Sequence, residues 1–247
     1  MTVFEKLQER RKSRPLHFTL IDPDRQEPAK AGAMARSAME LGTDAVLVGG
    51  SLGDAYGDRL LKTVEEIKKQ SNLTVILFPN SAQQVAPNAD AILFMSLLNS
   101  RSPQFLIGEQ AKGAFMVKKH NIEPMGMGYM IIESGSTTSA AWVGDVNPIP
   151  RDKPEIAAGY ALAAKYFGMK FIYLEAGSGA KYTVPPEMIA AVKGAVGHDT
   201  MVIVGGGIRS PAAAGEKVAA GADVIVTGTI VENDMEKFRS IMKAIKG

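Results

Sequence analysis

Three glycine-rich segments in the second half of the chain have the composition of an anion-binding site. They are Glu175-Ala-Gly-Ser-Gly-Ala180, Gly205-Gly-Gly-Ile-Arg209 and Gly228-Thr229, and each directly follows a short apolar run. Glycine lets backbone N–H groups approach an anion without a Cβ in the way. A helix that begins after such a loop adds further donors and the positive end of its dipole. We expect these segments to bind a phosphate monoester rather than to be tight turns without a ligand.

An acidic turn near the N-terminus is a candidate site for a divalent cation. Leu20-Ile-Asp-Pro-Asp-Arg25 ends one apolar run, and Gly49-Gly-Ser51 ends the next. Mg²⁺ keeps several waters and often takes only one or two protein carboxylates together with phosphate oxygens of a substrate. Asp22, with a hydroxyl and carbonyl groups beside it, fits that preference. A turn followed by a capped helix explains the same residues without a metal, so both interpretations stay open.

A scaffold must bring these distant segments together, and the apolar runs indicate which one. The runs are short, continuous and mostly rich in Val, Ile, Leu or Phe, which is typical of strands buried on both faces of a parallel sheet. They cover Leu16–Ile21, Asp44–Val48, Leu73–Phe78, Ala91–Met95, Gly128–Ile132, Phe171–Leu174, Met201–Val204 and Val224–Val226. Helical spacing predicts helices over Ala29–Leu41, Gly57–Gln70, Pro103–His120, Lys153–Phe167, Pro185–Gly194, Pro211–Ala220 and Met235–Ile245, with a weaker one after Asn80.

Eight strands that alternate with helices in 247 residues predict an α/β fold, a (β/α)₈ TIM barrel. A doubly wound open sheet is the alternative, but it normally has a phosphate loop after its first strand, and this chain has none there. No Pro-, Ser- or Gly-rich linker divides the sequence, so we expect residues 1–247 to form a single domain. Strand ends face the catalytic mouth of such a barrel. We therefore expect the phosphate site after strands six, seven and eight.

Composition excludes several classes of protein. With 28 basic and 26 acidic side chains the net charge is only +2, which lacks the strong basic field of a nucleic-acid-binding protein. The chain has no cysteine, which excludes disulfides, thiolate zinc sites and cysteine nucleophiles. No apolar window is long enough to span a membrane, and Met1–Arg14 is charged without a signal core. We therefore expect a cytoplasmic protein.

A weak internal repeat accompanies three of the predicted strands. Gly42–Ser51 resembles Gly221–Ile230, and Pro87–Ser96 is a looser copy; each places an Asp directly before an apolar run. Similar turns between a helix and a strand demand similar residues. Turn chemistry and true duplication therefore both remain possible explanations.

Seven motifs, in order, resemble the geranylgeranylglyceryl phosphate synthase family. They are Thr19-Leu-Ile-Asp-Pro-Asp24, Gly49-Gly-Ser51, Met95-Ser-Leu-Leu-Asn-Ser100, Trp142-Val-Gly-Asp145, Tyr173-Leu-Glu-Ala-Gly-Ser-Gly179, Val204-Gly-Gly-Gly-Ile-Arg209 and Val226-Thr-Gly-Thr229. The resemblance runs from about Leu16 to Asn233 and implies a TIM-barrel prenyltransferase of archaeal ether-lipid synthesis. Its substrates would be sn-glycerol 1-phosphate and geranylgeranyl diphosphate, its cofactor Mg²⁺. Leu20 stands where the bacterial heptaprenyl group has Lys, so the archaeal-type group fits better.

The resemblance also implies roles for individual residues. Asp22 and Ser51 would hold the magnesium ion. Glycerol 1-phosphate would be bound by Tyr173, Leu174, Glu175, Ala176, Gly177, Ser178, Gly179, Gly206, Gly207, Gly228 and Thr229. We assign Glu175 the role of accepting a proton from the attacking hydroxyl, because it lies beside the expected phosphate loop. A magnesium ion at Asp22 would neutralise the departing diphosphate as a Lewis acid.

The prenyl tail needs an apolar trough, for which the sequence offers more candidates than it can sort. They are Phe78, Phe94, Met95, Leu97, Leu98, Met125, Met127, Tyr129 and Met130. Trp142, the only tryptophan, falls in a long loop expected after strand five. It is a candidate contact in a homo-oligomer, and a loop that caps the core is the alternative. Two other functions remain open: a phosphosugar isomerase or synthase that uses acid–base groups at the ends of strands one and five, and a non-catalytic phosphometabolite sensor.

Overall fold

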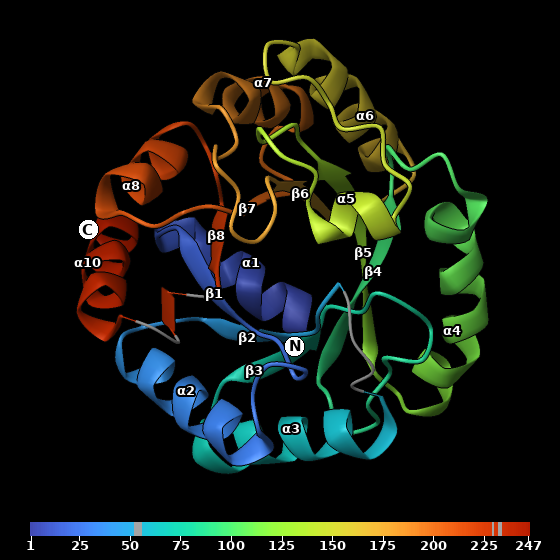
Figure 1. Cartoon of the computed structure of the whole chain (residues 1–247), viewed down its shortest axis with the longest axis vertical. Coiled ribbons are helices and arrows are strands. Elements are labelled where there is room, and N and C mark those ends of the chain that lie inside the picture. Colours follow the sequence, from blue (N-terminus) through green and yellow to red (C-terminus); the bar gives the residue numbers. More distant parts are fainter. Residues whose placement is uncertain (52–55, 229, 232–233) are drawn as a thin grey trace.

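A computed structural model describes residues 1–51, 56–228, 230–231 and 234–247 (Figure 1). Eight parallel strands pair in chain order, and the last pairs with the first, which closes the barrel. This confirms the predicted TIM barrel. The strands are β1 (Leu16–Ile21), β2 (Ala45–Val48), β3 (Thr74–Leu77), β4 (Ala91–Leu97), β5 (Glu123–Ile131), β6 (Phe171–Glu175), β7 (Met201–Gly205) and β8 (Val224–Thr227).

Helices surround the barrel as a ring (Figure 1). The ring contains α2 (Pro28–Glu40), α3 (Gly57–Gln70), α4 (Glu109–Lys119), α6 (Pro154–Tyr166), α7 (Pro186–Val196), α8 (Pro211–Ala219) and α10 (Met235–Lys246). A short π-helix, η1 (Gln104–Gly108), leads into α4, where the sequence predicts one continuous helix. None of these helices, nor any other in the described ranges, is long and apolar enough to cross a membrane.

The helix predicted after Asn80 is wrong, because residues 80–90 form turns and bends. The segment between β3 and β4 is short and has Pro79 near one end and Pro87 near the other, which leaves little room for a helix. In turn, α5 (Ser139–Val143) replaces part of the loop expected after the fifth strand. The Thr138 hydroxyl caps α5 by accepting the N–H of Ala141 at 3.3 Å.

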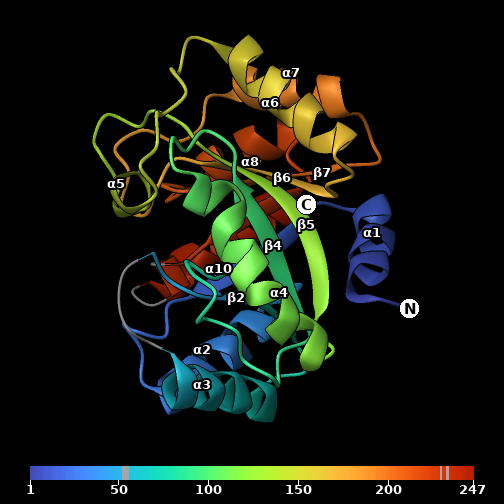
Figure 2. The same cartoon turned by 90° about the vertical axis from the view of Figure 1, so that its right-hand side faces the viewer.

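Helix α1 (Val3–Ser13) was not predicted, and it closes one end of the barrel. Figure 2 shows α1 and α5 at opposite ends. Leu7 of α1 is buried among the side chains that fill the barrel, and Phe4 contacts Phe171 edge-on at 5.5 Å. The Glu123 carboxylate at the start of β5 accepts the N–H groups of Val3 and Phe4, which stabilises the N-terminus of α1. The mouth at the other end is thus the open one.

The sequence repeat around Asp44, Asp90 and Asp223 has a structural explanation. Each Asp precedes a strand, and its carboxylate accepts the backbone N–H of the second residue of the preceding strand, at 2.9, 2.8 and 2.7 Å respectively. Each also forms an ion pair with a lysine of a surrounding helix, in turn Lys246, Lys68 and Lys193. These contacts lie at the closed end, where side chains serve stability rather than chemistry. Shared turn chemistry is thus sufficient to explain the repeat, and duplication is not required.

Candidate functional site

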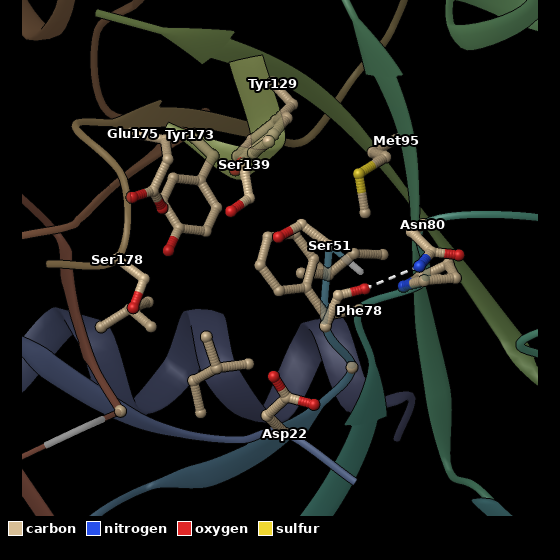
Figure 3. Close-up of a pocket in the computed structure, with 18 of the residues that line it drawn as sticks. Asp22, Ser51, Phe78, Asn80, Met95, Tyr129, Ser139, Tyr173, Glu175 and Ser178 are labelled. Atoms are coloured by element: carbon tan, nitrogen blue, oxygen red, sulfur yellow. Dashed lines mark hydrogen bonds between the residues drawn. The ribbon is translucent and has the colours of Figure 1, made fainter. Parts of the chain in front are cut away.

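A cavity of about 680 Å³ lies at the carboxyl end of the barrel strands. Residues that follow the strands by one to three positions line it, among them Asp22 after β1, Ser51 after β2 and Gly228 after β8. Figure 3 shows Glu175 and Tyr173 together on one side, Asn80 and Met95 on the opposite side, and Asp22 apart from both. The scaffold therefore brings the candidate residues to one mouth.

Most residues expected to bind glycerol phosphate line this cavity. Those that do are Tyr173, Glu175, Gly177, Ser178, Gly179, Gly206, Gly207 and Gly228. The side chains of Leu174 and Ala176 instead pack into the core between the sheet and the helices. Thr229 lies outside the described residues, so its expected role stays a prediction.

The loops after β6 and β7 require glycine for steric reasons. Gly177, Gly179, Gly206 and Gly207 have φ values of +102°, +74°, +87° and +70°, which L side chains rarely adopt. A Cβ on Gly206 would in addition overlap the carboxylate of Glu175. Helix α8 begins shortly after this loop and is capped by the Ser210 hydroxyl, which accepts the N–H of Ala213 at 3.1 Å. Bare amides and a nearby helix N-terminus are the features that favour an anion.

Glu175 is the buried carboxylate of the cavity, with only 7% of its surface exposed. Burial raises its pKa from 4.5 to about 7, although hydrogen bonds from the Gly177 N–H and from the side chain of Tyr173 act in the opposite direction. A carboxylate with a pKa near neutrality can accept a proton at working pH and release it again. The geometry therefore suits Glu175 to the role of a general base.

An aromatic cluster lies beside Glu175. The rings of Phe78 and Tyr173 stack at 5.5 Å, and Tyr129 packs edge-on against both, at 5.6 and 5.2 Å. Burial raises the pKa of both tyrosines well above 10, and the charge of Glu175 raises it further. The tyrosines therefore keep their hydroxyl protons, and Tyr173 can donate its proton in a hydrogen bond to Glu175.

The candidate site for a divalent cation combines Asp22 with Ser51. Asp22 accepts the Asp24 N–H at 3.0 Å and pairs with Arg25 at 3.3 Å. Gly50 leaves the carboxylate accessible, because a Cβ there would lie 2.7 Å from an oxygen of Asp22. The Asn80 amide holds this loop by donating to the Gly50 carbonyl at 2.9 Å (Figure 3).

The donor set at Asp22 decides which metal it fits. No group of three or more His, Asp or Glu side chains able to hold a metal occurs among the described residues. One carboxylate, one hydroxyl and an open space suit Mg²⁺, which takes most of its ligands from water and substrate phosphate oxygens. They do not suit a metal held by an all-protein cage.

The apolar part of the cavity extends from the barrel towards η1 and α4. Of the nine apolar candidates in the sequence, Phe78, Phe94, Met95, Leu97 and Tyr129 line it, whereas Leu98, Met125, Met127 and Met130 do not. Sequence reasoning missed Phe105 of η1 and Val117 of α4, since neither follows a strand. It also missed Asn80, which stands shortly after β3 and could have been found by the same strand-end rule that selects Asp22.

His17 and Trp142 lie away from the lining of the cavity. His17 is fully buried, with ring nitrogens 2.6 Å from the Thr43 hydroxyl and 2.9 Å from that of Thr227. Burial lowers its pKa from 6.5 to about 3, so it stays neutral. Trp142 projects from α5 with 80% of its surface exposed.

Comparisons with known proteins agree with this geometry. A model of the PcrB family matches residues 6–246. The chain is 53% identical to geranylgeranylglyceryl phosphate synthase of Thermococcus kodakarensis, over 99% of this chain and 96% of that protein. Its identity to the enzyme of the same name from Pyrococcus furiosus is 55%, over 94% and 88%.

A solved structure supports the same relationship. The crystal structure of (S)-3-O-geranylgeranylglyceryl phosphate synthase from Thermoplasma acidophilum, in complex with its substrate sn-glycerol-1-phosphate, superposes with a TM-score of 0.94. The two sequences are 41% identical, and the match covers 100% of this chain and 99% of that one. The chain therefore belongs to the PcrB family, as a relative of the geranylgeranylglyceryl phosphate synthases that its sequence resembles.

Proposed function

We propose that this chain is a Mg²⁺-dependent prenyltransferase that joins sn-glycerol 1-phosphate to geranylgeranyl diphosphate through an ether bond. The observation that carries the proposal is the position of Glu175, whose pKa is about 7. It lies between the glycine loops suited to a phosphate and the aromatic cluster, beyond which the cavity continues into the apolar part near η1 and α4, called the apolar arm below. The names of the relatives at about half sequence identity support the same substrates.

In the proposed reaction, the 3-hydroxyl oxygen of glycerol 1-phosphate bonds to C1 of the allylic chain while the bond from C1 to the diphosphate oxygen breaks. The hydroxyl proton passes to the Glu175 carboxylate, and diphosphate leaves with the electron pair of the broken bond. Tyr173 orients Glu175 by donating a hydrogen bond to it. A Mg²⁺ ion held by Asp22 and Ser51 would supply Lewis-acid neutralisation of the diphosphate charge.

The apolar arm gives the prenyl tail a place to be buried. Phe94, Met95, Leu97 and Phe105 contribute large apolar side chains to its wall. Each buried CH₂ group contributes about 0.8 kcal/mol to binding. Such an apolar region is expected in a site for a lipid diphosphate, whereas a site for a small phosphosugar does not require one.

The isomerase alternative also lacks a second acid–base group. It requires such a group at the end of β5, where the nearest carboxylate belongs to Glu133. That side chain is exposed and does not line the main cavity. Prenyl transfer therefore agrees better with the structure.

One reaction mixture separates the candidate functions. The protein is incubated with labelled sn-glycerol 1-phosphate, geranylgeranyl diphosphate and MgCl₂, and the organic extract is analysed for the ether product. We expect product from the wild type and none when MgCl₂ is replaced by EDTA. Binding of glycerol 1-phosphate without product, by a protein that is folded, would contradict prenyl transfer and favour a sensor.

We also propose that the chain forms a homo-oligomer and that Trp142 contributes to its interface. Trp142 exposes 80% of its surface on a short helix, and large aromatic side chains are enriched in interfaces. Trp142→Ala should lower the mass measured by light scattering, while Tyr166→Ala, an equally exposed aromatic on α6, serves as a control. An oligomeric wild type with a Trp142→Ala variant of unchanged mass would exclude this interface.

A further inference from the structure

Two cations that line the cavity have no role in the mechanism above. The charged side chains of the lining, within the described part of the chain, are Asp22, Arg25, Glu109, Glu175, Arg209 and Lys237. Arg25 forms an ion pair with Asp22. Arg209 and Lys237 form no ion pair with any carboxylate of the described residues, and both are exposed at the mouth.

Both cations stand on elements that belong to or follow the glycine loops. Arg209 ends the glycine loop after β7, and its guanidinium reaches the loop after β6, since a Cβ on Gly179 would lie 3.9 Å from Nη2. Lys237 stands in the first turn of α10, the helix that follows Gly228 and β8. Arg209 therefore flanks the loops suited to an anion, and Lys237 lines the same cavity from the helix that follows β8.

Their positions are unfavourable in the absence of an anion. Arg209 directly precedes Ser210, the N-cap of α8, and Lys237 lies in the turn that follows Asp234, the N-cap of α10. The N-terminus of a helix carries partial positive charge and disfavours cations. A dianion bound between the glycine loops would compensate both side chains and both helix ends.

We propose that Arg209 and Lys237 are side-chain ligands of the phosphate of the phosphorylated alcohol and hold it from the solvent side, opposite the backbone amides. The proposal rests on the proposed function only in taking the loops after β6, β7 and β8 as the phosphate site. Its chemical reason is that two anionic substrates must meet in one cavity with Glu175. Neutral amides leave the repulsion between them, whereas two cations on the monoester reduce it, and the planar fork of Arg209 matches phosphate oxygens.

The test measures binding directly and does not depend on turnover. Isothermal titration with sn-glycerol 1-phosphate is carried out on the wild type, Arg209→Gln, Lys237→Gln and the control Arg239→Gln. Arg239 lies two residues after Lys237 on the same helix, pairs with Glu236 and does not line the cavity. We expect about a tenfold or larger loss of affinity in each of the first two variants, as for the loss of a hydrogen bond to a charged group, and none in the control. Arg209→Lys should recover part of the loss.

Kinetic constants identify which anion the cations contact. If the proposal is right, Arg209→Gln raises KM for glycerol 1-phosphate and leaves kcat and KM for geranylgeranyl diphosphate close to the wild type. Unchanged affinity in either variant would overturn the assignment of that residue. A rise in KM for the diphosphate alone in Arg209→Gln or in Lys237→Gln would overturn the assignment of that residue to the monoester. A wild type that binds glycerol 1-phosphate without making ether would refute the proposed function but leave the binding comparison valid.

Discussion

Glu175→Gln is expected to lower activity and to raise stability at alkaline pH. The amide has the same shape and keeps an oxygen that can accept the Gly177 N–H, but it cannot take the hydroxyl proton. A well-placed general base contributes about 10²–10⁴-fold to rate. We therefore expect kcat to fall by that factor, while KM for glycerol 1-phosphate changes by less than about threefold, because the loss is of a transition-state interaction.

The stability effect follows from the pKa of Glu175. Its pKa is raised from 4.5 to about 7 on folding, so the ionised form is disfavoured in the folded state. The folded protein binds the proton more tightly than the unfolded chain, and stability therefore decreases as pH rises from 4.5 to 7 and then levels off. A shift of this size lowers the free energy of unfolding of the wild type by about 3 kcal/mol at pH 8. Glutamine does not ionise, so the variant is free of this loss. The variant should then be more stable than the wild type at pH 8 and similar to it at pH 4.5.

Two measurements check this prediction. Product formation is followed from pH 5.5 to 9, where the wild-type kcat should rise through about pH 7 and the variant should lack this rise. Urea unfolding at pH 5 and pH 8 gives the free energies. A Glu175→Gln enzyme with kcat within threefold of the wild type would remove Glu175 from proton transfer, and a variant no more stable at pH 8 would contradict the raised pKa.

Three further substitutions test other parts of the site and fold. Asp22→Asn should lower kcat by about 10²-fold or more and raise the Mg²⁺ concentration for half-maximal rate. Binding of glycerol 1-phosphate, measured by titration calorimetry, should not change. A Mg²⁺ dependence equal to that of the wild type would exclude Asp22 as a metal ligand. Gly206→Ala should weaken glycerol 1-phosphate binding at least tenfold, because its φ of +87° and the adjacent Glu175 carboxylate exclude a Cβ; wild-type affinity would show that the loop does not hold the phosphate. Asp223→Ala should lower the free energy of unfolding by about 3 kcal/mol, since Lys193 and the Val202 N–H lose a buried partner, and leave kcat unchanged; a loss smaller than 1 kcal/mol would show that this contact is unimportant.

The sequence predicts the barrel well because its strands are buried on both faces. Continuous apolar runs such as Met201–Val204 mark their own positions, and the structure extends that strand by one residue, Gly205. The same continuity does not indicate which side chains of a strand face the inside of the barrel and which face the surrounding helices. Leu97 lines the cavity and its neighbour Leu98 packs towards the helices, although the two residues are identical.

The site could be predicted only where chemistry follows a strand. Asp22 and Glu175 stand at strand ends and were found by that rule. The apolar arm depends on Phe105, which reaches the cavity from a π-helix that helical periodicity alone does not reveal. The pKa of Glu175 also depends on burial by segments distant in sequence, which no local pattern encodes.

The closure of one end of the barrel by α1 has a practical consequence for handling this protein. Leu7 and Phe4 close the far end of the barrel, and the cavity lies at the other end, on the side of α5, so substrates and products of the proposed reaction exchange there (Figure 2). The amino terminus points away from that end. A purification tag or a surface linker attached to the amino terminus would leave substrate exchange unobstructed, whereas a label on α5 near Trp142 would lie beside the mouth of the cavity.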